Sequence, residues 1–267
     1  MSAALVITLR ETLEAALIVG ILLAYLKKTQ GAKGVRYVWG GVVAGIVLSL
    51  VLAWVFGAYL GGFEGQAEEL YEGVMMLVAA GLLTWMILWM LKQRRNIKKD
   101  LENKASMHLK NSRPWGLFAL SFVGVAREGI ETVIFLQAAL VSSDGAEVLW
   151  GGLLGIVLAI VLAFALFKGA VEIPLKKFFT FTSVILILFA AGLVAHGVHE
   201  LQEAMVVPVI AEHIWDINGI LNEKGAFGSF LKGLFGYNGN PNLLEVVAYF
   251  LYLMGIAVVW QRLESKD

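Results

Sequence analysis

Two short charged stretches lie inside long apolar runs of this sequence. Residues 10–14 read Arg-Glu-Thr-Leu-Glu and residues 127–131 read Arg-Glu-Gly-Ile-Glu, so both follow the pattern Arg-Glu-x-x-Glu. On a helix, the two glutamates of each stretch project from one face, and each arginine lies four residues before the second glutamate, within reach of it. Four facing carboxylates would form an oxygen cage suited to iron(III), manganese, calcium or magnesium rather than copper(I). The candidate metal ligands are Glu11, Glu14, Glu128 and Glu131, with Arg10 and Arg127 as supporting charge pairs.

The charges of these two motifs do not balance. Four glutamates stand against two arginines, which leaves a deficit of two positive charges. An ionisable group in the middle of a membrane costs about 2.5–3.5 kcal/mol on insertion scales, so such groups usually mark an ion or proton path. A bound multivalent cation, or protonation of two carboxylates, would cancel the deficit. A salt-bridge cluster that only locks two helices together is the alternative, but it explains one Arg–Glu pair per helix and leaves the other glutamate of each motif without a role.

The composition places these motifs in a membrane protein. Of 267 residues, 59% are hydrophobic and 16% are charged, and the mean hydropathy is +0.77, whereas soluble domains carry about 25% charged residues. Lysine and arginine total 21, as do aspartate and glutamate, so there is no basic surplus for binding nucleic acid. The absence of cysteine excludes disulfides, thiolate metal sites and cysteine nucleophiles. No serine nucleophile constellation is visible either, so we expect a protein that is not an enzyme and has no resident cofactor.

Seven apolar runs are long enough to cross a bilayer as helices, since a span needs about 20 residues. No basic segment precedes the first run and charged residues interrupt it, so we expect a retained span rather than a cleaved signal peptide. The fold class is therefore an all-α membrane protein with seven transmembrane helices. We expect a single transmembrane domain over residues 1–267, embedded in the lipid bilayer of the cell (inner or plasma) membrane. The predicted spans are 4–26, 38–60, 70–91, 115–140, 148–168, 178–200 and 243–261.

Lysine and arginine cluster in alternate connections between these spans. The first and third connections are strongly basic, whereas the second and fourth contain no basic residue. Short basic loops are retained on the cytoplasmic side. We therefore predict that the N-terminus lies outside the cell and the C-terminus lies in the cytoplasm.

The same rule puts the long connection 201–242 outside. Residues 212–223 mix isoleucine, leucine and tryptophan with acidic residues. This pattern suits either a short amphipathic helix at the membrane surface or a packed cap on the bundle, and we keep both interpretations. Residues 236–241 are typical of a turn.

Parts of the sequence recur at a fixed offset. Trp39-Gly40-Gly41 and Ala79-Ala80-Gly81-Leu82 reappear 111 residues later, at 150–152 and 190–193. A repeat unit of three spans must insert its second copy upside down, which predicts an inverted 3+3 arrangement with the site near the midplane, as in many secondary transporters. The two repeats would be 1–91 and 115–200, and the span 243–261 would be an addition.

Acidic and histidine side chains gather near the outer ends of the third and sixth spans. Their helical spacing could form an outer site that collects the metal, or they could be solvated loop residues and hydrogen-bonded histidines. The methionines of the third span, Met90 among them, are interpreted as packing residues, and Trp85 and Trp89 as membrane-interface anchors. The residues of the possible outer site are Glu68, Glu69, Glu72, His196, His199, Glu200 and Glu203.

The paired Arg-Glu-x-x-Glu motifs, on the first and fourth of seven spans, resemble those of the oxidase-dependent ferric-iron permeases of fungi and the related EfeU-like bacterial permeases. In span number and motif placement this resemblance covers nearly the whole chain. It implies a permease that imports iron, with ferric iron as the first expectation and the four motif glutamates as ligands. It also implies an external oxidase or iron-delivery protein as a partner, and it leaves the oligomeric state open.

Two alternatives remain at this point. Members that act on ferrous iron or lead are ascribed to the same superfamily, so the cargo could be another divalent metal such as ferrous iron, lead or manganese. A haem-containing membrane redox protein that uses His196 or His199 as an iron ligand is the second alternative.

Overall fold

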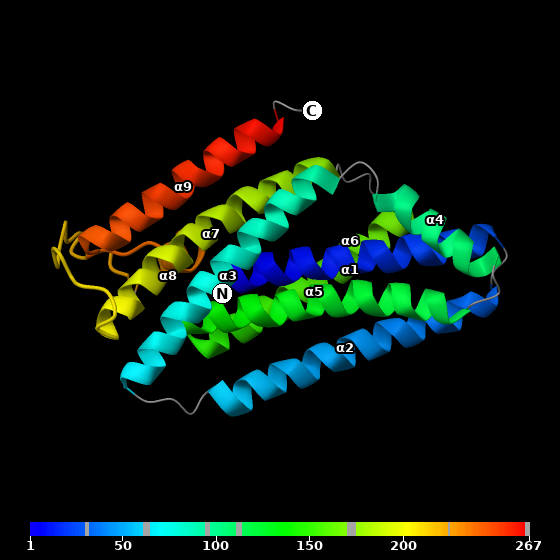
Figure 1. Ribbon diagram of the computed structural model, residues 1–267, viewed down its shortest axis with the longest axis horizontal. Coiled ribbons are helices and arrows are strands. Elements are labelled where there is room, and N and C mark those ends of the chain that lie inside the picture. The colour runs from blue at the N-terminus through cyan, green and yellow to red at the C-terminus, as the bar shows by residue number, and fades with distance from the viewer. Residues whose placement is uncertain are drawn as a thin grey trace.

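The computed structural model describes residues 1–29, 32–60, 65–93, 97–110, 114–169, 175–223 and 225–264. Within these ranges the chain is 85% helical and has no strand, which confirms the all-α fold. The long helices run side by side (Figure 1). The described helices are α1 (Ser2–Lys28), α2 (Ala32–Leu60), α3 (Gln66–Gln93), α4 (Ile97–Lys110), α5 (Pro114–Ser142), α6 (Gly145–Phe167), α7 (Leu175–Glu203), α8 (Ala226–Phe235) and α9 (Leu243–Glu264).

A long helix covers each of the seven predicted spans. Five of these helices, α2, α3, α6, α7 and α9, contain segments long and apolar enough to cross a membrane. The other two, α1 and α5, are 27 and 29 residues long but each carries an arginine and two glutamates near its middle. These three central charges distinguish α1 and α5 from the other five helices. The seven-span count and the orientation of the termini stay predictions.

Each motif-bearing helix packs closely against a small-residue helix. α1 lies against α6, and α5 lies against α2. Thr8 of α1 donates a hydrogen bond to the carbonyl oxygen of Gly152 on α6 over 2.9 Å. A methyl group added at Gly155 would collide with Thr8, and one added at Gly41 of α2 would collide with Ser121 of α5. Glycine is needed at these positions because the two backbones nearly touch.

The pairing of helices relates to the inverted repeat. If α1 corresponds to α5 and α2 to α6, as the repeat predicts, then the α1–α6 pair is the counterpart of the α5–α2 pair. α3 and α7, the third helices of the two repeats, pack against each other. Every repeat helix thus has a partner in the other repeat. The division into two repeats and a seventh helix stays a prediction, which this packing fits.

The charged motif of α1 lies between two apolar clusters. Ile7, one turn before Arg10, belongs to the largest cluster of buried side chains, which joins α1, α3, α5 and α7. Leu13, in the turn after Arg10, belongs to a second cluster that includes Met90 of α3 and Ala159 of α6. The motif is therefore enclosed by apolar side chains on both sides along the helix.

A helix occupies part of the connection that sequence analysis treated as a cytoplasmic loop. α4 packs against α1 and α5. Its Ala105 is fully buried beside Leu22 and Leu26 of α1 and Leu117 of α5. Leu101 and Ala105 lie one turn apart, so this short helix presents a small apolar face in an otherwise charged segment.

The outer connection differs from one prediction and agrees with another. Residues 212–223, interpreted as an amphipathic helix or a cap, are not helical, so the helix interpretation is wrong. The backbone N–H groups of Ile214 and Ile217 instead donate to the carbonyl groups of Pro241 and Gly239. The only helix in the described part of this connection is α8, which follows residue 225. It ends at Phe235 and is capped by Gly236, whose backbone is left-handed with φ 65°, and the chain bends at residues 239 and 240 within the predicted turn over 236–241.

Candidate metal site

Carboxylates from the two motifs meet where α1 and α5 pack together. Glu11 of α1 and Glu128 and Glu131 of α5 each offer one carboxylate oxygen, and these three oxygens lie within 4.8 Å of one another. Some point therefore lies within about 2.8 Å of all three oxygens, since 4.8 Å divided by √3 is about 2.8 Å. Oxygen ligands hold hard cations at about 2.0–2.6 Å. A small inward adjustment of the side chains would place all three in contact with one cation.

Each arginine binds the second glutamate of its own motif. Arg10 Nε donates to Glu14 Oε1 over 2.9 Å, and Arg127 Nε donates to Glu131 Oε1 over 2.9 Å. These are the pairs, four residues apart, that the motif spacing predicts. Arg127 also lies 3.9 Å from Glu128. In each motif the arginine thus holds the second glutamate most closely, whereas the first glutamate, Glu11 or Glu128, accepts no hydrogen bond from it.

Several carboxylate oxygens at this site are buried and have no hydrogen-bond partner among the described residues. They are both oxygens of Glu11 and the Oε2 atoms of Glu128 and Glu131. Glu11 is 1% exposed and Glu128 is 4% exposed. A buried carboxylate without a partner is strongly unfavourable unless a proton or a cation compensates it. The arrangement can therefore hold a cation, with oxygen ligands from two helices.

The two arginines differ in their surroundings. Arg10 is fully buried, and its Nη2 atom lies 2.7 Å from the sulfur of Met90 on α3. The side chain of Arg127 is 31% exposed, and its guanidinium lies 4.3 Å from the ring centroid of Trp89 on α3. The ring of Trp85 lies farther away, at 5.9 Å. Identical motifs are therefore supported by different neighbours.

The predicted outer site is divided between two environments. His199 bridges two carboxylates, with Nδ1 3.0 Å from Glu245 and Nε2 3.2 Å from Glu203. Gly73 and Gly197 let α3 and α7 approach closely, which brings Glu200 beside the outer turn of α3. Of the acidic residues on that turn, Glu68 is exposed, and Glu69 and Glu72 are partly exposed.

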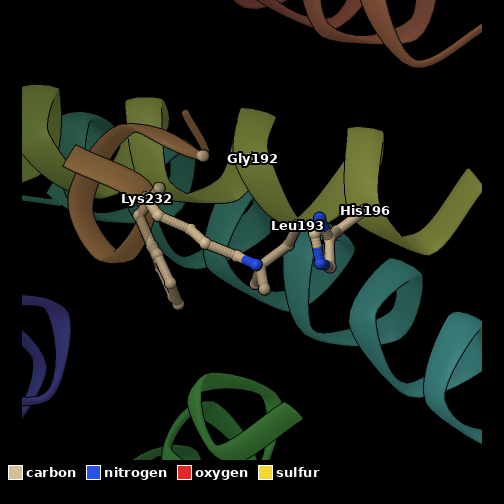
Figure 2. Close-up of a pocket in the computed structure, with 6 residues that line it drawn as sticks. Gly192, Leu193, His196 and Lys232 are labelled. Atoms are coloured by element: carbon tan, nitrogen blue, oxygen red, sulfur yellow. The ribbon is translucent and has the colours of Figure 1, made fainter. Parts of the chain in front are cut away.

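His196 points to a different place from His199, although the two rings are only 5.9 Å apart. It lines a small pocket together with Leu193 and Lys232. Figure 2 shows the Lys232 side chain running from α8 towards Leu193 and His196 on α7. Within the described ranges, the outer residues form no group of three ligands comparable to the one between α1 and α5. Metal binding by the outer site stays a prediction.

Comparison with known proteins identifies the family of this chain. The family described as the iron permease FTR1 family matches residues 1–263. The chain belongs to this family. The ferrous iron permease EfeU of Escherichia coli O157:H7 is 37% identical over 256 residues, which are 95% of this chain and 93% of that protein. The ferrous iron permease EfeU of Yersinia pestis is also 37% identical over 256 residues, covering 95% of this chain and 91% of the relative. No solved structure matches the chain.

Membership of the FTR1 family, together with the five apolar helices, makes this chain a multi-pass membrane protein of an iron permease family. The resemblance carried by the paired motifs is thus confirmed at the level of the family. The residues that this FTR1 permease uses as ligands, the oxidation state of the iron and the direction of transport are taken up below as proposals.

Sequence analysis missed three residues that contact the charged groups of this FTR1 permease. Trp89 was interpreted as an interface anchor and Met90 as a packing residue, yet they lie against Arg127 and Arg10. The third is Glu245 of α9, which is 3% exposed and accepts hydrogen bonds from the amide groups of Asn238 and Asn242 as well as contacting His199. A glutamate followed by an apolar span was the only signal for it.

Proposed function

We propose that this permease imports iron through the four motif glutamates and that Fe²⁺ is the ion its charges suit best. The observation that carries the proposal is the group of buried carboxylate oxygens without hydrogen-bond partners among the described residues, centred on Glu11. A cation bound there would supply the missing partners of all of them at once. Family membership supports iron as that cation.

The charge balance favours a divalent ion. The Arg10–Glu14 and Arg127–Glu131 pairs are each neutral, so two negative charges remain on the other two motif glutamates. Fe²⁺ would bring the site to neutrality, whereas Fe³⁺ would leave one surplus positive charge in apolar surroundings, where an uncompensated charge is costly. The names of the relatives from Escherichia coli and Yersinia pestis also specify ferrous iron. Ferric iron, the expectation from the motif resemblance, is therefore the alternative cargo.

The arginines and glutamates of the two motifs have different roles in binding. Each arginine fixes one carboxylate in place, because the Nε–Oε1 hydrogen bonds to Glu14 and Glu131 hold those side chains in one rotamer. Glu11 and Glu128 keep free oxygens, which replace water molecules of the incoming ion. The ion then passes from an outer face rich in carboxylates to the central site and on to the cytoplasm. This route assumes the predicted orientation in the inner membrane, with the N-terminus outside.

An uptake experiment tests the ligand assignment. Purified protein is reconstituted into liposomes, and uptake of radioactive Fe²⁺ is measured under a reductant for wild type, Glu11→Gln and Glu128→Gln. Glutamine keeps the shape of each side chain but removes the charge. Loss of groups that only support metal ligands costs about 10–100-fold, so we expect loss of a charged ligand to lower uptake by about 100-fold or more. Glu212→Gln is the control, because Glu212 is exposed on the outer connection.

The same assay separates the candidate ions. Mn²⁺ and Pb²⁺ are added as competitors, and ferric citrate is offered without reductant. Uptake of Fe²⁺ that outpaces ferric citrate and resists the competitors supports the proposal. Faster uptake from ferric citrate would establish the ferric alternative, and normal Fe²⁺ uptake by Glu11→Gln would exclude the central site altogether. A dependence on an external oxidase or delivery protein, which the resemblance implies, would appear as faster ferric uptake when a candidate partner is added.

A further inference from the structure

Two consecutive residues of α3 contact the arginines of both motifs. Trp89 lies under the guanidinium of Arg127, 4.3 Å from ring centroid to Cζ, and Met90 places its sulfur 2.7 Å from Nη2 of Arg10. Successive residues of a helix point about 100° apart. At this position on α3, the side chain of Trp89 therefore points towards α5 and that of Met90 points towards α1.

The contact with Trp89 suits a guanidinium that must hold a carboxylate. A planar guanidinium stacks on the face of an indole and keeps its edge N–H groups free to donate. Arg127 uses this edge to donate from Nε to Glu131. The ring thus fixes the plane of the guanidinium without competing for its hydrogen bonds.

Met90 plays a comparable part for Arg10. A thioether sulfur is a weak, polarisable acceptor. The sulfur of Met90 accepts a hydrogen bond from Nη2 of Arg10, while Nε of Arg10 donates to Glu14. The Nη1 atom of Arg10 has no partner among the described residues. Met90 is therefore the residue that holds the far end of this guanidinium.

We propose that Trp89 and Met90 are positioning residues, which set the orientation of Arg127 and Arg10 and, through them, the orientation of the two arginine-bound glutamates. The inference rests on the proposed function, because it concerns the same carboxylate site. It adds that α3, which carries no motif of its own, determines the geometry of both halves of the site. Because α3 packs against α7 through Gly73 and Gly197, a shift of the α3–α7 pair would reorient both arginines together.

Fe²⁺ uptake kinetics in proteoliposomes test this role through the KM. In Trp89→Leu the guanidinium loses its stacking surface, and we expect the KM for Fe²⁺ to rise about two- to thirtyfold, the range that corresponds to measured cation–π interactions. In Trp89→Phe, which keeps an aromatic ring face, we expect a KM close to that of the wild type. Met90→Leu, which removes only the sulfur contact with Arg10, should raise the KM by a smaller factor. Trp85→Leu is the matched comparison, because that ring is exposed, stacks on Trp89 and lies farther from Arg127, so we expect a clearly smaller rise in the KM than for Trp89→Leu.

A purely structural role would give a different result. It would lower the amount of folded transporter and the maximal rate of uptake, and it would leave the KM of the remaining protein unchanged. A wild-type KM for Trp89→Leu, or an equal rise for Trp85→Leu, would therefore overturn the inference. If Glu11→Gln is inactive but the Trp89 variants have the wild-type KM, this inference alone is refuted. If Glu11→Gln shows normal uptake, the proposed function is refuted.

A double-mutant cycle shows whether Trp89 acts through Arg127. Arg127→Lys keeps the charge but loses the planar group that stacks. If the ring only positions this guanidinium, adding Trp89→Leu to Arg127→Lys should change the KM by less than about twofold, because the two changes then remove the same interaction. Should the lysine variant fail to transport, the cycle is measured as Fe²⁺ binding by the purified proteins. Fully additive effects would refute the positioning role.

Discussion

Replacing the second glutamate of each motif by glutamine should destabilise the protein by unequal amounts, although the two motifs have the same pattern. Glu14→Gln removes the charge partner of Arg10, which is fully buried. Loss of one partner from a buried pair costs about 3–5 kcal/mol, because the other charge is left uncompensated. Glu131→Gln does the same to Arg127, but that side chain is 31% exposed and keeps its contacts with Trp89 and Glu128. We expect a cost of about 1–3 kcal/mol there, between the values for exposed and buried pairs.

Glu11→Gln provides the internal comparison for these two variants. Its carboxylate has no hydrogen-bond partner among the described residues, so no arginine loses its partner. Removing an uncompensated negative charge should leave the metal-free protein as stable as wild type or more stable. Glu11→Gln thus separates the role of binding a cation from the role of holding the fold.

Thermal unfolding of the metal-free proteins in detergent, followed by intrinsic tryptophan fluorescence, measures this order. The expected order of melting temperatures places Glu11→Gln at or above wild type, Glu131→Gln below it and Glu14→Gln lowest. Equal losses for Glu14→Gln and Glu131→Gln would show that the different surroundings of the two arginines have no energetic effect. A melting temperature of Glu11→Gln below both of the others would refute the distinction between paired and unpaired carboxylates.

Three further predictions follow from the described contacts. Fe²⁺ at 100 times its Kd should stabilise the wild-type protein by about 2.7 kcal/mol, and a thermal-shift titration under anaerobic conditions should show no such stabilisation for Glu11→Gln at the same concentration. Glu245→Ala should lower the free energy of unfolding by about 2–4 kcal/mol, because the side-chain amide of Asn238 and Nδ1 of His199 lose their partner and Asn242 loses one of its two acceptors; the melting temperature of Glu245→Gln should lie between those of the alanine variant and wild type. Gly155→Ala should cost about 1–3 kcal/mol through collision with Thr8, whereas Gly81→Ala, which meets no atom within 4 Å, should be neutral or slightly stabilising in the same melting experiment.

The features that sequence analysis predicted correctly are those that depend on local spacing. Apolar runs of sufficient length predicted the positions of seven long helices, because backbone hydrogen bonds in such runs close within one segment. The pairing of Arg10 with Glu14 and of Arg127 with Glu131 follows from a separation of four residues on a helix, whatever surrounds it. These properties do not require knowledge of how one helix lies against another.

The features that sequence analysis missed depend on contacts between distant segments. Met90 and Arg10 are 80 residues apart, and only the rotation of α3 about its axis brings the sulfur to the guanidinium. Residues 212–223 have the composition of an amphipathic helix, but the backbone of Ile214 and Ile217 is satisfied by residues 239–241 instead. The sequence did not indicate α4, because its apolar face consists only of Leu101 and Ala105 in a charged segment. Charge and composition do not encode any of these arrangements.

The pairing of α1 with α6 also constrains the order in which the helices can assemble. Thr8 meets its hydrogen-bond partner Gly152 only after a further 144 residues have been synthesised, which takes about 7–30 s at ordinary rates of translation. During that interval the Arg10–Glu14 pair can form within the first helix, but Glu11 lacks its carboxylate neighbours on α5. The chain therefore cannot mature helix by helix from its N-terminus. The surroundings of the first motif cannot be complete before α5 and α6 arrive, and a nascent chain stalled before them would leave Glu11 without its neighbours on α5.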